Sequence, residues 1–175
     1  FFHESDNQFD YYGQKTSTAQ SDELMDYNVL SIHTDKPNNE LWIGSRAGLS
    51  NYSEDKDLFT HYPFQIDGKH INNQILSIVK GDNGIFWLGT EKGLFTWNIR
   101  TKNFRAVDDH PDFRDKINVV FLDNKNILWV GTQSKGLKRV GSQLDDYDIH
   151  FSIAEDKISL PNINDIFQLP DESIW

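Results

Sequence analysis

Six histidines are the side chains of this sequence best suited to bind a metal ion or transfer a proton, but their spacing favours neither role. They are His3, His33, His61, His70, His110 and His150. None forms H-x-H or H-E-x-x-H, the spacings that direct two imidazoles at one metal ion. The fragments "GDNG" and "DNKN" lack the twelve-residue frame and terminal glutamate of a calcium loop, so they are predicted to be turns. We therefore expect no metal site and no cofactor.

The sequence also lacks the short motifs that mark a catalytic nucleophile or a phosphate site. It contains no G-x-S-x-G, no Walker loop and no G-x-G-x-x-G. The adjacent carboxylates at residues 108–109 and 145–146 are more typical of a solvated face than of an acid–base pair. We expect a segment that is not an enzyme. A lyase or hydrolase whose catalytic groups come from separate loops stays an alternative.

Four asparagines indicate a different chemistry, because each precedes a tryptophan at a similar distance. Asn28, Asn73, Asn118 and Asn164 precede Trp42, Trp87, Trp129 and Trp175 by 14, 14, 11 and 11 residues. Four amides facing one channel could hydrogen-bond the hydroxyl groups of a sugar; alternatively, each amide caps its own loop. Aromatic and guanidinium groups in nearby loops would suit saccharide faces and hydroxyls. The further predicted ligand contacts are Arg46, His61, Tyr62, His110 and Arg114.

An internal repeat contains these tryptophans and must position the candidate side chains. Near copies of one motif are "LWIGSRAGL" at 41–49, "FWLGTEKGL" at 86–94 and "ILWVGTQSKGL" at 127–137, and "SIW" at 173–175 begins another. The tryptophans are 45, 42 and 46 residues apart, a period typical of propeller blades or helical arrays. Short β-branched and aromatic runs alternate with Gly, Asn and Asp, and no segment has sustained helical periodicity. The repeat is therefore predicted to be made of β-strands.

Each repeat unit is predicted to form four antiparallel strands. The first strand of a unit covers 28–32, 74–79, 118–122 or 164–169, the second contains the tryptophan motif, the third follows it, and the fourth covers 58–64, 103–107 or 149–153. We predict an all-β fold, a β-propeller made of four-stranded antiparallel blades, as a partial ring or a ring of about four blades. The expected divisions are a half blade and linker at 1–27, blades at 28–72, 73–117 and 118–163, and a half blade at 164–175.

Packing between blades explains why tryptophan and glycine recur in the motif. A tryptophan fills the gap between neighbouring blades and buries roughly 150–250 Å². The glycine two residues later lies on the same face, where we expect a side chain to meet the next blade. A second glycine lies in the following turn, where a positive φ is expected. These glycines are Gly44, Gly89 and Gly131 on the strand, and Gly48, Gly93 and Gly136 in the turn.

The composition excludes several classes of function. The formal net charge is −10 and no Lys/Arg cluster appears, which argues against nucleic acid and against anionic lipid as partners. There is no cysteine, so a disulfide scaffold and a thiolate metal site are excluded. No apolar run approaches the roughly 18 residues needed to span a bilayer. The first residues, "FFHESDNQ", have neither an initiator Met nor a basic region, so we expect a piece of a longer protein rather than a signal peptide.

The repeat resembles the two-component regulator propeller repeat, most closely in "SIVKGDNGIFWLGTEKGLFTWNIRTKNF" at 77–104. The copies depart from that pattern in detail: Ser45 stands where Thr is usual, and "GTQSKGL" has one extra residue. In that family the repeats form seven-bladed propellers, which are the extracytoplasmic sensors of membrane-spanning histidine kinases, hybrid two-component regulators or GGDEF proteins. Several of these sensors look like oligosaccharide receptors.

The resemblance implies an extracytoplasmic, periplasmic module of an inner-membrane receptor that senses an oligosaccharide or another small molecule. Its expected partners are the ligand, the remainder of the receptor chain and a second copy in a homodimer. Besides the lyase or hydrolase, a protein-interaction scaffold that uses its loop face stays an alternative.

Overall fold

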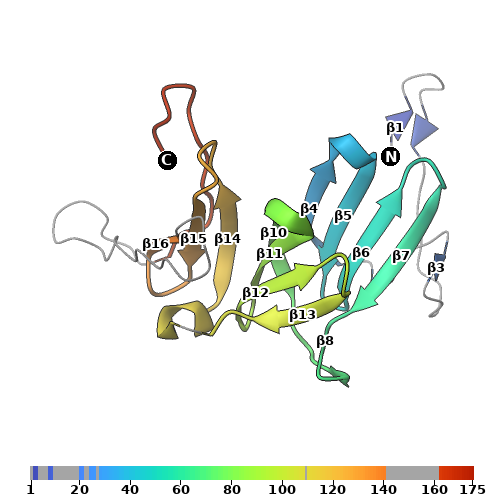
Figure 1. Ribbon diagram of the computed structural model, residues 1–175, viewed down its shortest axis with the longest axis horizontal. Coiled ribbons are helices and arrows are strands. Elements are labelled where there is room, and N and C mark those ends of the chain that lie inside the picture. The colour runs from blue at the N-terminus through green and yellow to red at the C-terminus, as the bar shows by residue number, and fades with distance from the viewer. Residues whose placement is uncertain are drawn as a thin grey trace, which may run out of the picture.

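The computed structural model describes residues 2–3, 8–9, 20–21, 24–26, 28–108, 110–140 and 162–175 (Figure 1). In these residues the chain is all-β: its regular elements are strands and the short 3-10 turns η1 (Lys36–Asn38), η2 (Asp82–Gly84) and η3 (Pro111–Arg114). This part of the chain holds no helix long and apolar enough to cross a membrane. Alternating β-branched and aromatic residues between Asn-, Asp- and Gly-rich turns account for this architecture.

The first large sheet is an antiparallel meander of four strands with a short fifth strand at its outer edge. The meander consists of β4 (Val29–Asp35), β5 (Glu40–Ser45), β6 (Gly48–Ser53) and β7 (Leu58–Pro63). The fifth strand, β3 (Gln20–Ser21), pairs with β7, so the order is β3-β7-β6-β5-β4. The short pair β1 (Phe2–His3) and β2 (Gln8–Phe9) forms a separate antiparallel ribbon.

The second and third large sheets repeat the meander. The second has the order β10 (Ile75–Lys80), β11 (Ile85–Thr90), β12 (Gly93–Asn98) and β13 (Asn103–Ala106). The third contains β14 (Ile117–Leu122), β15 (Leu128–Thr132) and β16 (Leu137–Val140). A small hairpin of β8 (Gln65–Ile66) and β9 (Lys69–His70) connects the first sheet to the second. The fourth strand predicted at 149–153 lies outside the described residues.

The sheets stand side by side, and the core lies between them (Figure 1). Between the first and second sheets, Trp42 is 1% exposed and its ring centroid lies 4.7 Å from that of Phe86 and 5.0 Å from that of Trp97. Between the second and third sheets, Leu94 and Phe113 pack with residues of β14 and β15. Because the inner strands β4, β10 and β14 contact one another in sequence, the sheets are arranged as blades about a common edge.

The glycines of the motif are placed as their positions predicted. A Cβ atom on Gly44 would lie 2.7 Å from Cγ2 and 2.9 Å from the carbonyl oxygen of Ile75, which belongs to the next sheet. The turn glycine Gly48 has φ +142°, and a Cβ atom there would lie 2.4 Å from the carbonyl oxygen of Tyr62. Gly93 and Gly136 also have positive φ, at +124° and +72°. The strand glycine of the motif therefore permits close backbone packing between blades, and the turn glycine permits a tight turn within a blade.

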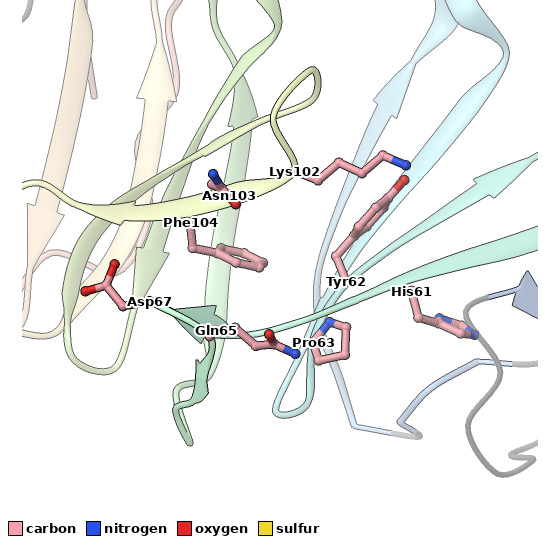
Figure 2. A pocket seen from close by; sticks show the side chains of 9 residues that line it. His61, Tyr62, Pro63, Gln65, Asp67, Lys102, Asn103 and Phe104 are labelled. Carbon is pink, nitrogen blue, oxygen red and sulfur yellow. The ribbon is translucent and has the colours of Figure 1, made fainter.

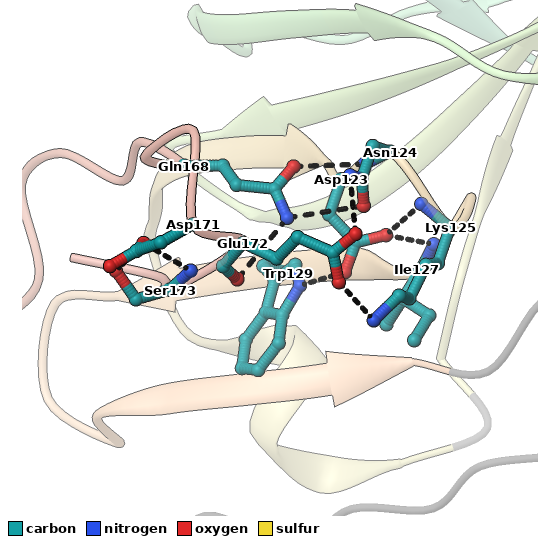
Figure 3. A network of polar contacts seen from close by, with 9 residues as sticks. All are labelled: Asp123, Asn124, Lys125, Ile127, Trp129, Gln168, Asp171, Glu172 and Ser173. Carbon is teal, nitrogen blue, oxygen red and sulfur yellow. Dashed lines mark hydrogen bonds and ion pairs between the residues drawn. The ribbon is translucent and has the colours of Figure 1, made fainter.

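Residues 162–175 form a short antiparallel pair beside the third sheet. Phe167 and Trp175 exchange backbone hydrogen bonds of 2.9 Å in both directions. Figure 3 shows how polar side chains tie this pair to the turn between β14 and β15. The Asn124 N–H donates to Gln168 Oε1 at 3.0 Å, and Lys125 Nζ lies 2.6 Å from Glu172 Oε2.

Asp123 organises the turn itself. Its carboxylate accepts hydrogen bonds from the backbone N–H groups of Lys125 and Ile127 and from the indole N–H of Trp129, each at 2.9 Å. Burial alone would raise the pKa of Asp123, but these hydrogen bonds outweigh it and hold the pKa below its ordinary value. The recurring tryptophan is therefore anchored here through its polar edge as well as through its ring.

The fold class predicted from the sequence is confirmed: the chain is an all-β propeller with four-stranded antiparallel blades. The first sheet, with β3 at its edge, lies at one end of the row of sheets, and residues 162–175 lie at the other (Figure 1). The described residues thus form a partial ring. The blade divisions at 28–72, 73–117, 118–163 and the two half blades stay predictions.

Candidate functional site

A cleft of about 400 Å³ opens between the outer strands of the first and second sheets (Figure 2). One wall comes from the end of β7 and from β8, and the other comes from the turn before β13 and its first residues. Its lining residues are His61, Tyr62, Pro63, Gln65, Asp67, Gly68, Lys102, Asn103 and Phe104. This volume is within the range of about 300–1,000 Å³ that small-molecule sites occupy.

Aromatic side chains form the floor of the cleft, because the core between the two sheets reaches the surface at this point. Tyr62 is stacked on Trp42, with ring centroids 6.1 Å apart and an interplanar angle of 23°. Phe104 is stacked on Phe64, with centroids 4.4 Å apart and an angle of 24°. In Figure 2, Tyr62 and Phe104 project into the space between the strands from opposite walls. Such rings present flat apolar surfaces to a ligand.

Polar groups form the rim of the cleft. Lys102 and Asn103 are exposed, and Lys102 has φ +55° in the tight turn that presents both residues. The Gln65 side chain lies 3.3 Å from His70 Nε2 across the β8–β9 hairpin, which holds the opposite rim. Burial, with a smaller contribution from the Glu40 carboxylate, raises the pKa of Tyr62, so its hydroxyl group stays protonated and available as a donor. The cleft therefore combines donors, acceptors and aromatic faces.

Of the loop residues predicted to contact a ligand, the structure brings His61 and Tyr62 to the cleft and leaves the others elsewhere. Both are strand residues of β7, and His61 Nδ1 lies 3.0 Å from Ser50 Oγ. Arg46 is exposed in the turn between β5 and β6.

His110 precedes η3 and Arg114 is its last residue, and neither lines the cleft. The ring nitrogen Nδ1 of His110 accepts a hydrogen bond from the Asp112 N–H at 3.2 Å and so caps this turn. Arg114 is exposed and donates to the carbonyl oxygen of Asp108 at 3.2 Å. These two side chains therefore stabilise their own connection.

Two of the predicted asparagines meet near the inner strands. Asn118 Nδ2 donates to the carbonyl oxygen of Ile163 at 3.0 Å and to Asn164 Oδ1 at 3.3 Å. It also donates to Asn162 Oδ1 at 2.7 Å, a residue that the spacing from tryptophan did not single out. We refer to Asn118, Asn162 and Asn164 as the asparagine cluster. The other two asparagines do not join it.

Asn28 and Asn73 act within their own loops. Asn28 is exposed, and its backbone N–H donates to Asp26 Oδ1 at 3.0 Å. Asn73 is fully buried, and its Oδ1 accepts from the Lys92 N–H at 3.1 Å, which fixes the turn between β11 and β12. The structure therefore places Asn28 and Asn73 apart from the asparagine cluster, and a ligand role for the four amides stays a prediction.

The register of the sheets explains this separation. Ile75 pairs with Thr90, and Ile117 pairs with Thr132, so Ile75 and Ile117 are equivalent positions. Asn73 and Asp115, each two residues earlier, are therefore equivalent as well. Asp115 accepts a hydrogen bond from the Ser134 N–H at 2.7 Å, as Asn73 does from the Lys92 N–H. Asn118 is instead the extra residue of a β-bulge between Ile117 and Val119. The spacings of 14 and 11 residues thus mark different positions.

Comparisons with known proteins agree with this architecture. Residues 69–92 match the two component regulator propeller family. The chain is 30% identical over 103 residues to histidine kinase P4 of Formosa agariphila, a stretch that is 54% of this chain and 8% of that protein. The chain therefore carries the propeller repeat that its sequence resembles, and it spans less than a tenth of this relative.

Solved structures share the fold over most of the chain. The extracellular domain of BT4673 of B. thetaiotaomicron, assigned as a one component and as a hybrid two component system, gives TM-scores of 0.68 and 0.67 at 23% identity. That similarity covers 87% of this chain and 20% of the other. PorZ, a surface component of the type-IX secretion system of Porphyromonas gingivalis, gives a TM-score of 0.59 at 16% identity over 76% of this chain and 22% of PorZ. At these identities the similarity establishes the fold.

Proposed function

We propose that this chain is part of an extracytoplasmic ligand-sensing module of a two-component or related transmembrane signalling receptor. The observation that carries the proposal is the propeller repeat at residues 69–92, in a chain that is similar over 87% of its length to an extracellular domain of a signalling system. The identity to a histidine kinase over 103 residues supports the same class. The remainder of the receptor would then supply the membrane anchor and the output domain.

We further propose that the ligand is an oligosaccharide bound in the cleft between β7–β8 and β13. The floor of Tyr62 and Phe104 would stack on sugar rings, which present apolar C–H faces. The rim groups of Asn103 and Gln65 would exchange hydrogen bonds with sugar hydroxyls, because an amide both donates and accepts. A neutral ligand fits a rim that carries one exposed cation, Lys102, and one exposed carboxylate, Asp67.

Thermal-shift screening of the chain against mono- and oligosaccharides tests this proposal. A ligand that binds only the folded state raises the melting temperature, by an amount that corresponds to about 2.7 kcal/mol at a concentration of roughly 100 times Kd. We expect at least one oligosaccharide to do so, and a calorimetric titration then gives its affinity. Absence of any shift across the panel would remove the ligand proposal and favour an interaction scaffold, and turnover of a saccharide would instead indicate a lyase or hydrolase.

Substitutions locate the site. Tyr62→Phe and Asn103→Ala each remove hydrogen-bonding groups from the cleft and leave its shape nearly intact, so each should weaken binding by roughly three- to tenfold. Asn118→Ala makes the corresponding change in the asparagine cluster and should leave the affinity unchanged. Arg114→Ala, a change at an exposed residue that does not line the cleft, is the matched control. Loss of affinity in Asn118→Ala alone would move the site to the asparagine cluster and contradict the cleft.

A further inference from the structure

The motif tryptophans of the second and third sheets direct their indole N–H groups at one equivalent position of the inner strand. The tryptophans Trp42, Trp87 and Trp129 pair with His33, Val79 and Phe121, and the position in question lies two residues after each of these partners. It is occupied by Asp35, Gly81 and Asp123. In the third sheet the Trp129 N–H donates to Asp123 Oδ2 at 2.9 Å, and in the second a Cβ atom on Gly81 would lie 3.0 Å from Trp87 Nε1. The first sheet therefore has an aspartate where an indole N–H can be expected to reach it.

Asp35 makes different contacts, although its position is equivalent to that of Asp123. Its Oδ2 atom accepts hydrogen bonds from Lys80 Nζ, on strand β10 of the next sheet, and from Asn38 Nδ2 at 2.7 Å. The Trp42 side chain is 1% exposed, and its indole N–H has no hydrogen-bond partner among the residues that the structure describes. Lys80 thus binds the carboxylate at the position where tryptophan binds it in the third sheet.

Two donors therefore compete for the carboxylate of Asp35. Burial would raise the pKa of Asp35, but the hydrogen bonds from Lys80 and Asn38 outweigh it and hold the pKa below its ordinary value, so the group is ionised and accepts strongly. A buried N–H group without a partner is unfavourable, so the Trp42 indole would gain from the same acceptor. The third sheet provides the other arrangement, in which the aspartate binds its own turn and its own tryptophan.

Trp42 lies between this ion pair and the floor of the cleft. The Trp42 ring centroid is 4.7 Å from that of Phe86, and Lys80 Nζ lies 6.0 Å from the same Phe86 centroid. Trp42 is also stacked on Tyr62, which lines the cleft. In the strand order β7-β6-β5-β4, Tyr62 is on β7 and Asp35 is on β4, so they lie on opposite sides of the Trp42 strand β5. An indole that turned toward Asp35 would therefore turn away from Tyr62.

We propose that Lys80 is a positioning residue: by binding Asp35 it keeps the Trp42 indole under Tyr62, and its removal lets the indole donate to Asp35 as Trp129 does to Asp123. The ion pair between the sheets and the cleft are then coupled through the orientation of one side chain. Because coupling between two sites is reciprocal, an occupied cleft would in turn strengthen the junction between the first and second sheets. The exchange of partners at Asp35 does not depend on a ligand, whereas the effect on the cleft rests on the proposed function.

Nuclear magnetic resonance of the indole N–H groups tests the exchange of partners on the isotope-labelled 175-residue chain, with no ligand present. The chain has five tryptophans, and Trp42→Phe identifies the signal of Trp42. In Lys80→Met we expect this proton signal to move downfield, toward that of the hydrogen-bonded Trp129. In the double variant with Asp35→Leu the signal should stay where it is in the unchanged chain, because the acceptor is gone. A Trp42 signal that keeps its place in folded Lys80→Met would overturn the proposal.

Two variants control for the change of charge. Lys80→Arg keeps a cation beside Asp35 and should leave the Trp42 signal unchanged. Lys125→Met removes an exposed lysine that pairs with Glu172 beside the third sheet, and it should also leave the Trp42 signal unchanged. The other indole signals report whether each variant is folded. If either control moves the Trp42 signal as Lys80→Met does, a non-specific effect explains the shift and the exchange of partners is wrong.

Calorimetric titration with an oligosaccharide that raises the melting temperature tests the effect on the cleft. Lys80→Met should weaken binding by roughly two- to tenfold, which corresponds to the loss of one aromatic contact, and Lys80→Arg should bind as the unchanged chain does. An unchanged affinity in Lys80→Met, together with a shifted Trp42 signal, would refute the positioning role. If no oligosaccharide binds the unchanged chain, the proposed function fails by itself, and the indole signals still decide whether Asp35 exchanges its partners.

Discussion

Replacing Gly44 by alanine tests whether the sheets are wedged together as closely as the structure indicates. The added Cβ atom would lie 2.3 Å from Ser31 Oγ, 2.7 Å from Ile75 Cγ2 and 2.9 Å from the Ile75 carbonyl oxygen. Optimal contacts between carbon atoms are about 3.5–4.0 Å, so all these atoms must move. The Ser31 hydroxyl already donates to the Ile75 carbonyl group at 3.1 Å, which restricts that movement.

The expected cost follows from the size of this overlap. Inserting one methyl group into a well-packed core destabilises a protein by about 1–3 kcal/mol, and the contact with backbone at Ile75 places Gly44→Ala toward the upper end. For a chain of this length about 1 kcal/mol corresponds to about 2–4 °C, so we expect the melting temperature to fall by about 5–10 °C. Gly44 does not have a positive φ, so the effect is attributed to the contacts with Ser31 in the same sheet and with Ile75 in the next.

Two other glycines calibrate the measurement. At Gly89 the nearest atoms are Ile117 Cγ2 at 3.0 Å and the Ile117 carbonyl oxygen at 3.1 Å, so Gly89→Ala should cost less than Gly44→Ala. At Gly68 nothing lies within 4 Å, but φ is +73°, so alanine there should cost about 1 kcal/mol through backbone conformation alone. Thermal and urea unfolding should rank the losses as Gly44 above Gly89 and Gly68. A Gly44→Ala chain that melts with the unchanged protein would refute wedge packing between the first and second sheets.

Substitutions at Asp123, His33 and Lys80 test the polar contacts. Asp123→Ala leaves three N–H donors without their acceptor and should lower the free energy of unfolding by about 2–3 kcal/mol in urea titrations, where an unchanged midpoint would contradict it. The pKa of Asp123 is lowered in the folded state, so the stabilisation from its carboxylate is complete above pH 3.8 and is lost as the pH falls through the folded-state pKa. Asp123→Asn should therefore make the free energy of unfolding less dependent on pH in acid, and an equally steep acid unfolding curve would refute this role. Burial lowers the pKa of His33, and Lys80 lowers it further while Asp35 opposes both. The free energy of unfolding should therefore decline as the pH falls below 6.5, because the unfolded chain then binds a proton at His33 more readily than the folded chain. Melting curves across this range should show a smaller decline in His33→Gln. Lys80→Met leaves Asp35, which is 4% exposed, without its cation and should cost about 1–3 kcal/mol, largely recovered in the double variant with Asp35→Leu.

The fold could be predicted from the sequence because the signals that specify it recur. Each motif places a tryptophan, a strand glycine and a turn glycine at nearly constant separations, and each requirement is local to one strand or one turn. The predicted first strands at 74–79 and 118–122 differ from β10 and β14 by one residue at most at either end. The pattern of hydrophobic residues and the residue types of the turns were therefore sufficient to predict the strands of the blades.

The candidate site could be predicted only in part, because it is formed by residues of different blades. His61 and Tyr62 were identified as aromatic residues near a long connection, but Asn103 and Phe104 belong to the next sheet and carry no local signal that links them to Tyr62. The Asp67–Gly68 pair of "QIDGKH" is a hairpin signal that could have located the β8–β9 wall. The four asparagines do not occupy equivalent positions: the same bulge recurs in each large sheet, but Asn73 lies two residues before its start at Ile75, whereas Asn118 lies one residue after its start at Ile117.

The position of the cleft also explains how one repeat could serve different ligands. The turn glycine of each motif lets the chain that leaves the outer strand approach closely: a Cβ atom on Gly48 would meet the Tyr62 carbonyl oxygen, and one on Gly93 would meet the Phe113 carbonyl oxygen, each at 2.4 Å. The two connections differ, since the first forms the β8–β9 hairpin and the second forms η3, which contains Phe113. The repeat thus provides a close approach at each turn glycine and leaves the connections free to differ. We therefore expect the residues that decide ligand specificity to lie in these connections, while the tryptophan motif maintains the spacing of the walls.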